Sequence, residues 1–205
     1  MNTNETHICR PSVDDLATIY EIHKRAFPGF FLTALGPVFL KGYYRAMLLK
    51  KDTIFLVERA DEIIGFACGL EDAASFNFKY MKKNIKQLAF SVCLAVTQRP
   101  SILFRVFTRP QDARKQPHRL GMIHLLSIAV DPKASGHGTG SRLLEAFKTE
   151  ALKRSFSEVY LTTDANGNEK ANAFYLKNGF RKINSHSSGN GRLMNEYICS
   201  LNHLK

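Results

Sequence analysis

The stretch from His124 to Leu144 constrains the fold of this chain more than any other. Residues 125–130 are all apolar except one serine, which predicts a buried strand. Pro132 ends that strand, because proline cannot donate to a β-ladder. Glycines then occupy alternate positions: Gly136, Gly138 and Gly140. Apolar residues follow at helical spacing: Leu143, Leu144, Phe147 and Ala151. The stretch therefore predicts a strand, a glycine loop and a helix.

A glycine loop at the start of a helix favours phosphate binding. Glycine allows close approach and positive φ, and the first helical turn has unpaired N–H groups at the positive end of its dipole. Two nucleotide motifs do not fit. The P-loop requires Lys before its final Ser/Thr, whereas Gly140 is followed by Ser141 and Arg142, and the dinucleotide fingerprint has a different glycine spacing. A tight turn without a ligand is the alternative.

The loop resembles the acyl-CoA pyrophosphate loop of the GNAT family of N-acetyltransferases, written Gln/Arg-x-x-Gly-x-Gly/Ala. Ser135, Gly138 and Gly140 fall on this pattern. Ser135 departs from it, since the family usually carries Gln or Arg there. The departure removes a long side chain but leaves the backbone N–H groups that would hold a diphosphate.

A second segment carries the same resemblance. It reads Asn168-x-x-Ala171-x-x-Phe174-Tyr175-x-Lys177-x-Gly179-Phe180 and matches the family's other CoA-binding segment at each quoted position. It begins 28 residues after Gly140, with a predicted helix and strand between, which is the family's order. The two motifs cover about residues 123–181, and the resemblance implies acetyl-CoA as the cofactor.

The resemblance also implies which residues bind that cofactor. They are Ile128, Ala129, Val130, Ser135, Gly136, His137, Gly138, Thr139, Gly140, Ser141, Asn168, Ala171 and Tyr175. Backbone groups near Ile128 and Val130 are expected to hold the pantetheine arm where this strand and the strand at 159–164 splay apart. One N–H there would polarise the thioester carbonyl.

The implied reaction is direct attack of an amine on the thioester, without a metal or a covalent enzyme intermediate. Tyr175, at the position of the family's tyrosine, is the expected general acid for the leaving thiolate. A tyrosine pKa of about 10 exceeds that of a thiol, about 8.5, so the proton moves as the bond breaks. The alternative is a tyrosine that only packs against the cofactor.

The family does not fix a general base. Asp164, at the end of the strand beside the splay, is the candidate, and Glu71 and His124 are the alternatives. Asp164 could equally cap the turn that follows it. His23, on the inner face of the first predicted helix, is expected to be a satisfied or surface histidine.

The predicted fold is one mixed α/β domain, residues 1–205, with a sheet splayed between its fourth and fifth strands. The predicted elements are a strand at 7–10, helices starting at 12 and near 37, a hairpin at 53–59 and 63–69, the central strand, loop and helix, a strand at 158–164, a short helix around 171–175, and a hairpin at 181–185 and 193–201. Three phenylalanines between the first two helices line either an acceptor pocket or the core.

Residues 73–119 form a predicted helical insertion between the third and fourth strands. They carry ten Lys or Arg and one acid, Asp112, so the chain's net charge of +11 belongs mainly to this segment. The insertion is a lid over an anionic substrate, a contact with an anionic membrane surface, or an ordinary packed segment with a basic side. Nucleic acid is not expected as a partner, because no recognition helix or aromatic-interleaved sheet accompanies the charge.

Composition excludes several other classes. An apolar content of 44% is ordinary for a globular protein, so disorder is not expected. Four scattered cysteines without a Cys-x-x-Cys pair predict free thiols rather than zinc or disulfides. The absence of an N-terminal signal and of a long apolar run predicts a cytoplasmic protein. The apolar insertion makes a homodimer a further expectation.

The acceptor is predicted from a looser resemblance. Thr162-Thr163-Asp164 with Asn168, and the opening around Phe27–Thr33, look like acetyltransferases of bacterial surface-polysaccharide synthesis, which act on nucleotide-linked amino sugars. The expected substrate is therefore a small-molecule primary amine. A protein, peptide or polyamine acceptor is one alternative, and a non-catalytic CoA-binding regulatory module is another.

Overall fold

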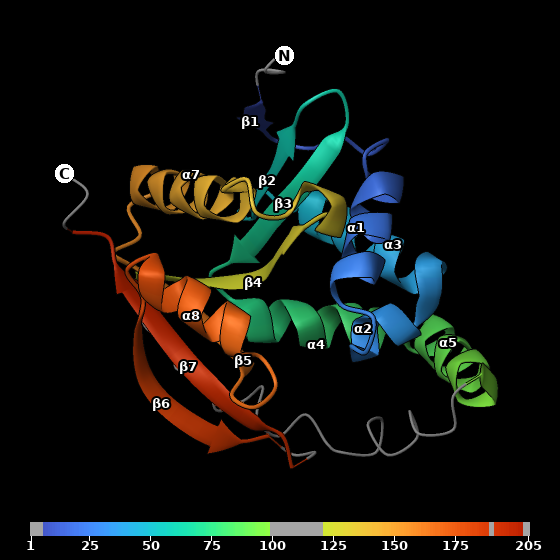
Figure 1. The fold of residues 1–205 in the computed structure, drawn as a ribbon. Helices are drawn as coiled ribbons and strands as arrows, with labels where there is room; N and C mark the ends of the chain where they lie inside the picture. The colour runs from blue at the N-terminus through green and yellow to red at the C-terminus, as the bar shows by residue number, and fades with distance from the viewer. Residues whose placement is uncertain (1–5, 99–120, 189–190, 203–205) are drawn as a thin grey trace.

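A seven-stranded mixed sheet forms the centre of the molecule, in the strand order β1-β2-β3-β4-β5-β7-β6 (Figure 1). The computed structural model describes residues 6–98, 121–188 and 191–202. The strands are β1 (His7–Cys9), β2 (Ile54–Arg59), β3 (Ile63–Leu70), β4 (Met122–Val130), β5 (Glu158–Asp164), β6 (Arg181–Ser187) and β7 (Leu193–Ser200). Neighbouring strands are antiparallel except β4 and β5, which confirms the predicted mixed α/β fold.

The sheet opens between β4 and β5, as predicted. The two strands pair only at their beginnings, through Met122–Glu158, Ile123–Val159 and His124–Tyr160. Beyond this point β4 stays with β3 as far as Val130, while β5 stays with β7. Figure 1 shows β4 turning away from β5 and β7, so that the sheet forms a V.

Helices cover both faces of the sheet. They are α1 (Leu16–Ala26), α2 (Phe31–Ala34), α3 (Gly36–Leu49), α4 (Ala73–Lys83), α5 (Ile85–Gln98), α7 (Thr139–Lys153) and α8 (Glu169–Lys177), with a 3₁₀ turn at Pro132–Ala134. One core cluster joins α1 and α3 to β2 and β3 through residues such as Ile19, Tyr44 and Phe66. A second joins α7 to the other face through residues such as Leu143 and Phe147.

The differences from the predicted elements are local. The loop expected between the first two helices contains the short helix α2. The first helix starts at Leu16 rather than at residue 12. The Ser12 N–H and hydroxyl both donate to the Asp15 carboxylate just before it. The insertion holds α4 and α5, and its predicted helical turns beyond Pro100 lie outside the described residues. Within the described ranges, no helix has the length and apolar character needed to cross a membrane.

Candidate functional site

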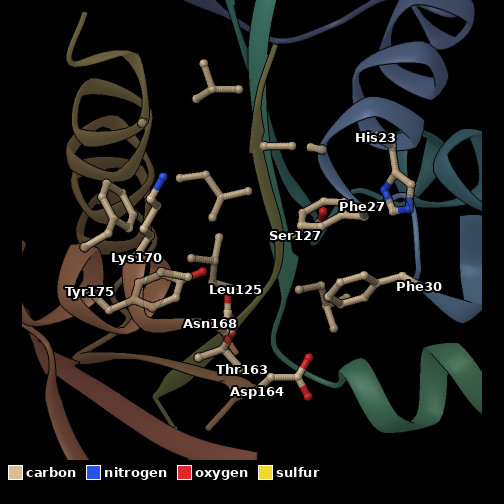
Figure 2. A pocket seen from close by; sticks show the side chains of 18 of the residues that line it. His23, Phe27, Phe30, Leu125, Ser127, Thr163, Asp164, Asn168, Lys170 and Tyr175 are labelled. Carbon is tan, nitrogen blue, oxygen red and sulfur yellow. Dashed lines mark hydrogen bonds between the residues drawn. The ribbon is translucent and has the colours of Figure 1, made fainter. Parts of the chain in front are cut away.

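A pocket of about 860 Å³ lies where β4 and β5 separate (Figure 2). Its walls come from β4, the glycine loop, α8, the end of β5, and the α1–α2 region. The predicted cofactor residues line this pocket with one exception. His137 is exposed, and its contribution to the loop is a backbone carbonyl that accepts a hydrogen bond from Arg142 Nη1 at 2.7 Å.

The glycine loop needs glycine for two reasons. Gly136 and Gly138 have φ values of +89° and +78°, a conformation that other residues rarely adopt. A Cβ at Gly140 would lie 3.3 Å from the Phe174 ring of α8. Gly138 is also the N-cap of α7 and makes no side-chain cap, so the first amides of α7 are available to an anion. The space around Gly136 is open, since a Cβ added there would have no atom within 4 Å.

A partly buried ion pair between Arg142 and Glu58 holds the glycine loop against β2. Arg142 Nε donates to Glu58 Oε1 at 2.9 Å, and Nη2 donates to Thr139 Oγ1 at 3.1 Å. Glu58 lies on β2 and is completely buried. The same guanidinium thus contacts β2, the start of α7 and the His137 carbonyl. Sequence reasoning missed this pair, since its members are 84 residues apart and neither belongs to a motif.

The central strand carries a β-bulge beside the opening. Cys68 of β3 pairs with Ser127, whereas the next residue, Gly69, pairs with Leu125. Leu126 is therefore the extra residue of the bulge, and a bulge leaves its extra residue out of the ladder. Leu126 and Ser127 both line the pocket. The strand prediction could not detect the bulge, because the apolar run continues through it.

Tyr175 projects from α8 into the pocket. Its hydroxyl points toward β4 (Figure 2), and its ring lies 5.8 Å from that of Phe180 and 5.9 Å from that of Tyr197. Burial raises the pKa of this hydroxyl above its usual value, so Tyr175 keeps its proton at neutral pH. The site thus holds a proton donor across from the bulged strand.

Asp164 also lines the pocket, and it is ion-paired. Arg192 Nε donates to Oδ1 at 2.8 Å, and Arg192 Nη2 donates to Oδ2. The Arg192 guanidinium lies 5.5 Å from the centre of the Phe30 ring, so it links the start of β7 to the α1–α2 region. Sequence reasoning did not single out Arg192, which lies in the predicted hairpin loop. The two alternatives to Asp164, Glu71 and His124, are not among the pocket-lining residues.

Aromatic side chains form the wall opposite α8. The three phenylalanines predicted either for the core or for a pocket, Phe27, Phe30 and Phe31, line the pocket. His23 lies beside them, 4% exposed, with burial lowering its pKa to about 4. Its Nδ1 is 2.7 Å from the Tyr44 hydroxyl, whereas its Nε2 has no hydrogen-bond partner in the described part of the chain. His23 is thus a buried rather than a surface histidine, with one ring nitrogen bonded and the other without a partner among the described residues.

Known proteins share this architecture. A family model described as "Acetyltransferase (GNAT) family" matches residues 16–180. Ribosomal-protein-S18-alanine N-acetyltransferase from Escherichia coli is 17% identical, with a TM-score of 0.60 and coverage of 96% of this chain and 94% of that chain. No curated protein sequence matches this chain significantly.

Two other solved structures share the fold. A spermidine N-acetyltransferase chimera from Vibrio cholerae and hSSAT is 12% identical, with a TM-score of 0.65 and coverage of 97% and 96%. The yncA protein from Salmonella typhimurium, solved with acetyl-CoA, is 15% identical, with a TM-score of 0.61 and coverage of 97% and 95%. At these identities the solved structures establish a common fold.

Proposed function

The chain belongs to the acetyltransferase (GNAT) family, and from this premise we propose that it moves an acetyl group from acetyl-CoA directly onto a primary amine of a small molecule. The observation that carries the proposal is the pocket between β4 and β5, which brings the glycine loop, the bulged strand and Tyr175 together. Each feature suits one part of a thioester cofactor. Together they distinguish an enzyme site from a simple phosphate-binding turn.

The residues present fit acetyl-CoA. The amides from Ser135 to Ser141 suit its diphosphate, and Lys170 and Lys177 add positive charge to the same pocket. Backbone groups of Ile128, Ala129 and Val130 lie on the stretch of β4 that no longer pairs with β5, so they suit the amides of the pantetheine arm. Asn168 and Ala171 line the facing wall. When bound, acetyl-CoA supplies an activated acetyl thioester.

The chain's own residues would then act at two atoms. An N–H at the Leu126 bulge donates to the carbonyl oxygen of the acetyl group, where negative charge develops as the new C–N bond forms. Tyr175 donates its proton to the sulfur as the C–S bond breaks. The pocket also holds the amine against the acetyl carbon, which removes much of the entropic barrier.

The attacking amine must also lose a proton, and Asp164 is our candidate for its acceptor. To act as a base, its carboxylate must release at least one of the two bonds from Arg192. Replacing Asp164 with Asn should shift the acidic limb of the pH–rate profile. Asp52→Asn is the matched control, because Asp52 is an exposed acid paired with Lys50 away from the pocket. An unshifted limb in Asp164→Asn removes Asp164 from this role.

The charges around the pocket favour a neutral or anionic acceptor. Among the described residues that line the pocket, Asp164 is the one carboxylate, and Arg192 already pairs with it. Because Arg192 neutralises Asp164, the described lining offers no unpaired carboxylate to attract a polyamine or a basic peptide. Within this class we propose a nucleotide-linked amino sugar as the acceptor to test first, since it offers negative phosphates and a primary amine.

The test is thiol release from acetyl-CoA across a panel of amines. The panel contains nucleotide-linked amino sugars, simple amino sugars, spermidine and a peptide with an N-terminal alanine. We expect release with an anionic or neutral amine. If acetyl-CoA binds but no amine of the panel causes thiol release, a non-catalytic regulatory module is favoured instead. Thiol release with spermidine or the peptide would change the substrate class.

A second surface suggests contact with a membrane. Phe78, Ile85 and Phe90 are exposed on α4 and α5, and Lys82, Lys83 and Lys86 are exposed beside them. Exposed apolar and basic side chains on neighbouring helices suit an anionic bilayer. We expect the protein to sediment with anionic but not zwitterionic vesicles, and to be released by salt. A concentration-dependent dimer without vesicle binding would instead assign the surface to a second copy.

A further inference from the structure

We infer that His23 recognises the acceptor: its Nε2 accepts a hydrogen bond from a polar hydrogen of the amine substrate, at the aromatic end of the pocket. This inference rests on the proposed function and deepens it. His23 lies outside both family motifs.

The position of His23 carries the first part of the argument. It projects from α1, is 4% exposed, and lines the pocket. Its ring meets the Phe27 ring edge-on at 4.9 Å. Figure 2 shows His23, Phe27 and Phe30 on one side of β4, and Lys170 and Tyr175 on the other. His23 therefore belongs to the wall away from the cofactor motifs, where the acceptor must enter.

We assign the ring proton of His23 to Nδ1. The Tyr44 hydroxyl lies 2.7 Å from His23 Nδ1 and 3.5 Å from Ser127 Oγ. With this assignment the Tyr44 oxygen accepts from Nδ1–H while its hydroxyl donates to Ser127 Oγ. In this tautomer Nε2 has a free lone pair. A buried polar atom of this kind normally has a partner, and the described residues supply none to Nε2.

The same contacts fix the ring in space. Tyr44 lies on α3 and is almost completely buried, while Ser127 follows the bulged residue Leu126 on β4. His23 is thereby connected to the strand beside which the acetyl group would lie. A hydrogen bond from the acceptor to Nε2 would set the distance between the acceptor's body and that strand.

The surroundings define the chemistry of the ligand. Phe27, Phe30 and Phe31 offer aromatic faces, and a neutral imidazole offers a single acceptor. Burial lowers the pKa of His23 to about 4, so the ring stays neutral at physiological pH. The matching acceptor carries a hydroxyl or N–H donor on a compact body with an apolar face, as the ring of an amino sugar does. A long flexible polyamine lacks that face.

Two substitutions test the inference with the most active amine of the panel. His23→Leu removes the acceptor atom and keeps the bulk, and we expect the KM for the amine to rise about tenfold. His23→Gln, whose amide oxygen can reach the Nε2 position, should recover part of that loss. The KM for acetyl-CoA and the unfolding temperature should stay unchanged, which a purely structural role of His23 would not allow.

The tautomer gives a second measurement that needs no variant. In ¹⁵N-labelled wild-type protein, the His23 ring should carry its proton on Nδ1, and addition of the active amine should move the Nε2 resonance. A proton on Nε2, or an unchanged amine KM in His23→Leu, overturns the inference while leaving the proposed function in place. Absence of turnover with every amine overturns the proposed function, and this inference with it.

Discussion

At the scale of single residues, burial sets the protonation states of Tyr175 and His23. Desolvation among Phe174, Phe180 and Tyr197 raises the pKa of the Tyr175 hydroxyl, so this residue would enter the proposed reaction protonated. The same burial makes a free tyrosinate costly, so the proton should leave only as negative charge builds on the sulfur. His23 is also neutral because it is buried, so its ring offers one N–H donor and one acceptor nitrogen.

Replacing Tyr175 with Phe should lower kcat at least about tenfold, because the leaving thiolate loses its proton donor. The dissociation constant of acetyl-CoA should change little, since the ring stays in place. Steady-state kinetics and calorimetric titration measure the two quantities. Tyr197→Phe is the matched control: it removes a hydroxyl that donates to Asn172 Oδ1 at 2.7 Å, so it should reduce stability without the loss of turnover.

Two buried histidines should make stability depend on pH. Burial lowers the pKa of both His23 and His124 to about 4. From about pH 6.5 down to about pH 4, the unfolded chain binds protons that the folded chain does not, so stability falls with pH, by up to about 3 kcal/mol for each histidine. Urea denaturation at a series of pH values measures the slope. His124→Phe, which keeps a ring beside Tyr160, should reduce that slope by about half. A slope equal to that of the wild-type protein would show that His124 does not contribute to the pH dependence of stability.

At the scale of elements, the start of α7 depends on backbone shape. Gly138 holds a left-handed conformation at the N-cap, and the amides that follow it are the proposed diphosphate site. Arg142 and Glu58 hold the loop to β2. These contacts hold the loop in one conformation, which limits the entropy that it would lose on binding a cofactor.

Gly138→Ala should raise the acetyl-CoA dissociation constant about tenfold, because relief of the φ strain turns the amides away from the diphosphate. Gly167→Ala provides the control. Gly167 has a φ of +66° in a loop outside the pocket lining, and a Cβ added there would meet open space. Both variants should lose about 1 kcal/mol of stability, and Gly138→Ala alone should lose affinity. Equal affinities would place the diphosphate elsewhere.

Most elements could be predicted because their signals are local. The alternation in 158–164 and the helical spacing after Gly140 depend on neighbours in sequence, and both elements appear as predicted. The Arg142–Glu58 and Arg192–Asp164 pairs, the Leu126 bulge and the unpaired Nε2 of His23 depend on segments that meet only in the fold. Those contacts determine the finer geometry of the candidate site. They could not be predicted, because the pattern of residue types along the chain does not show which distant segments meet.

At the scale of the whole molecule, two parts of the sheet meet along a short seam. β1 to β4 form one part and β5 to β7 the other, with three residue pairs joining β4 to β5. The Arg192 guanidinium over Phe30 adds one contact across the open side. A ligand between the parted strands would contact both parts.

Acetyl-CoA should therefore stabilise the whole protein. At a concentration about 100 times its dissociation constant, it contributes about 2.7 kcal/mol, which for a chain of this size raises the unfolding temperature by about 5–10 °C. Differential scanning fluorimetry measures the shift. Hydrogen exchange should slow at the amides of 128–130 and 135–141, whereas protection confined to another surface would contradict the proposed site.

The short seam between β4 and β5 has a consequence for the protein's lifetime in a cell. Proteases cut chains that open, and few backbone bonds cross between β4 and β5. A ligand that bridges the two strands opposes such opening, so it should slow proteolysis of the protein as its occupancy rises.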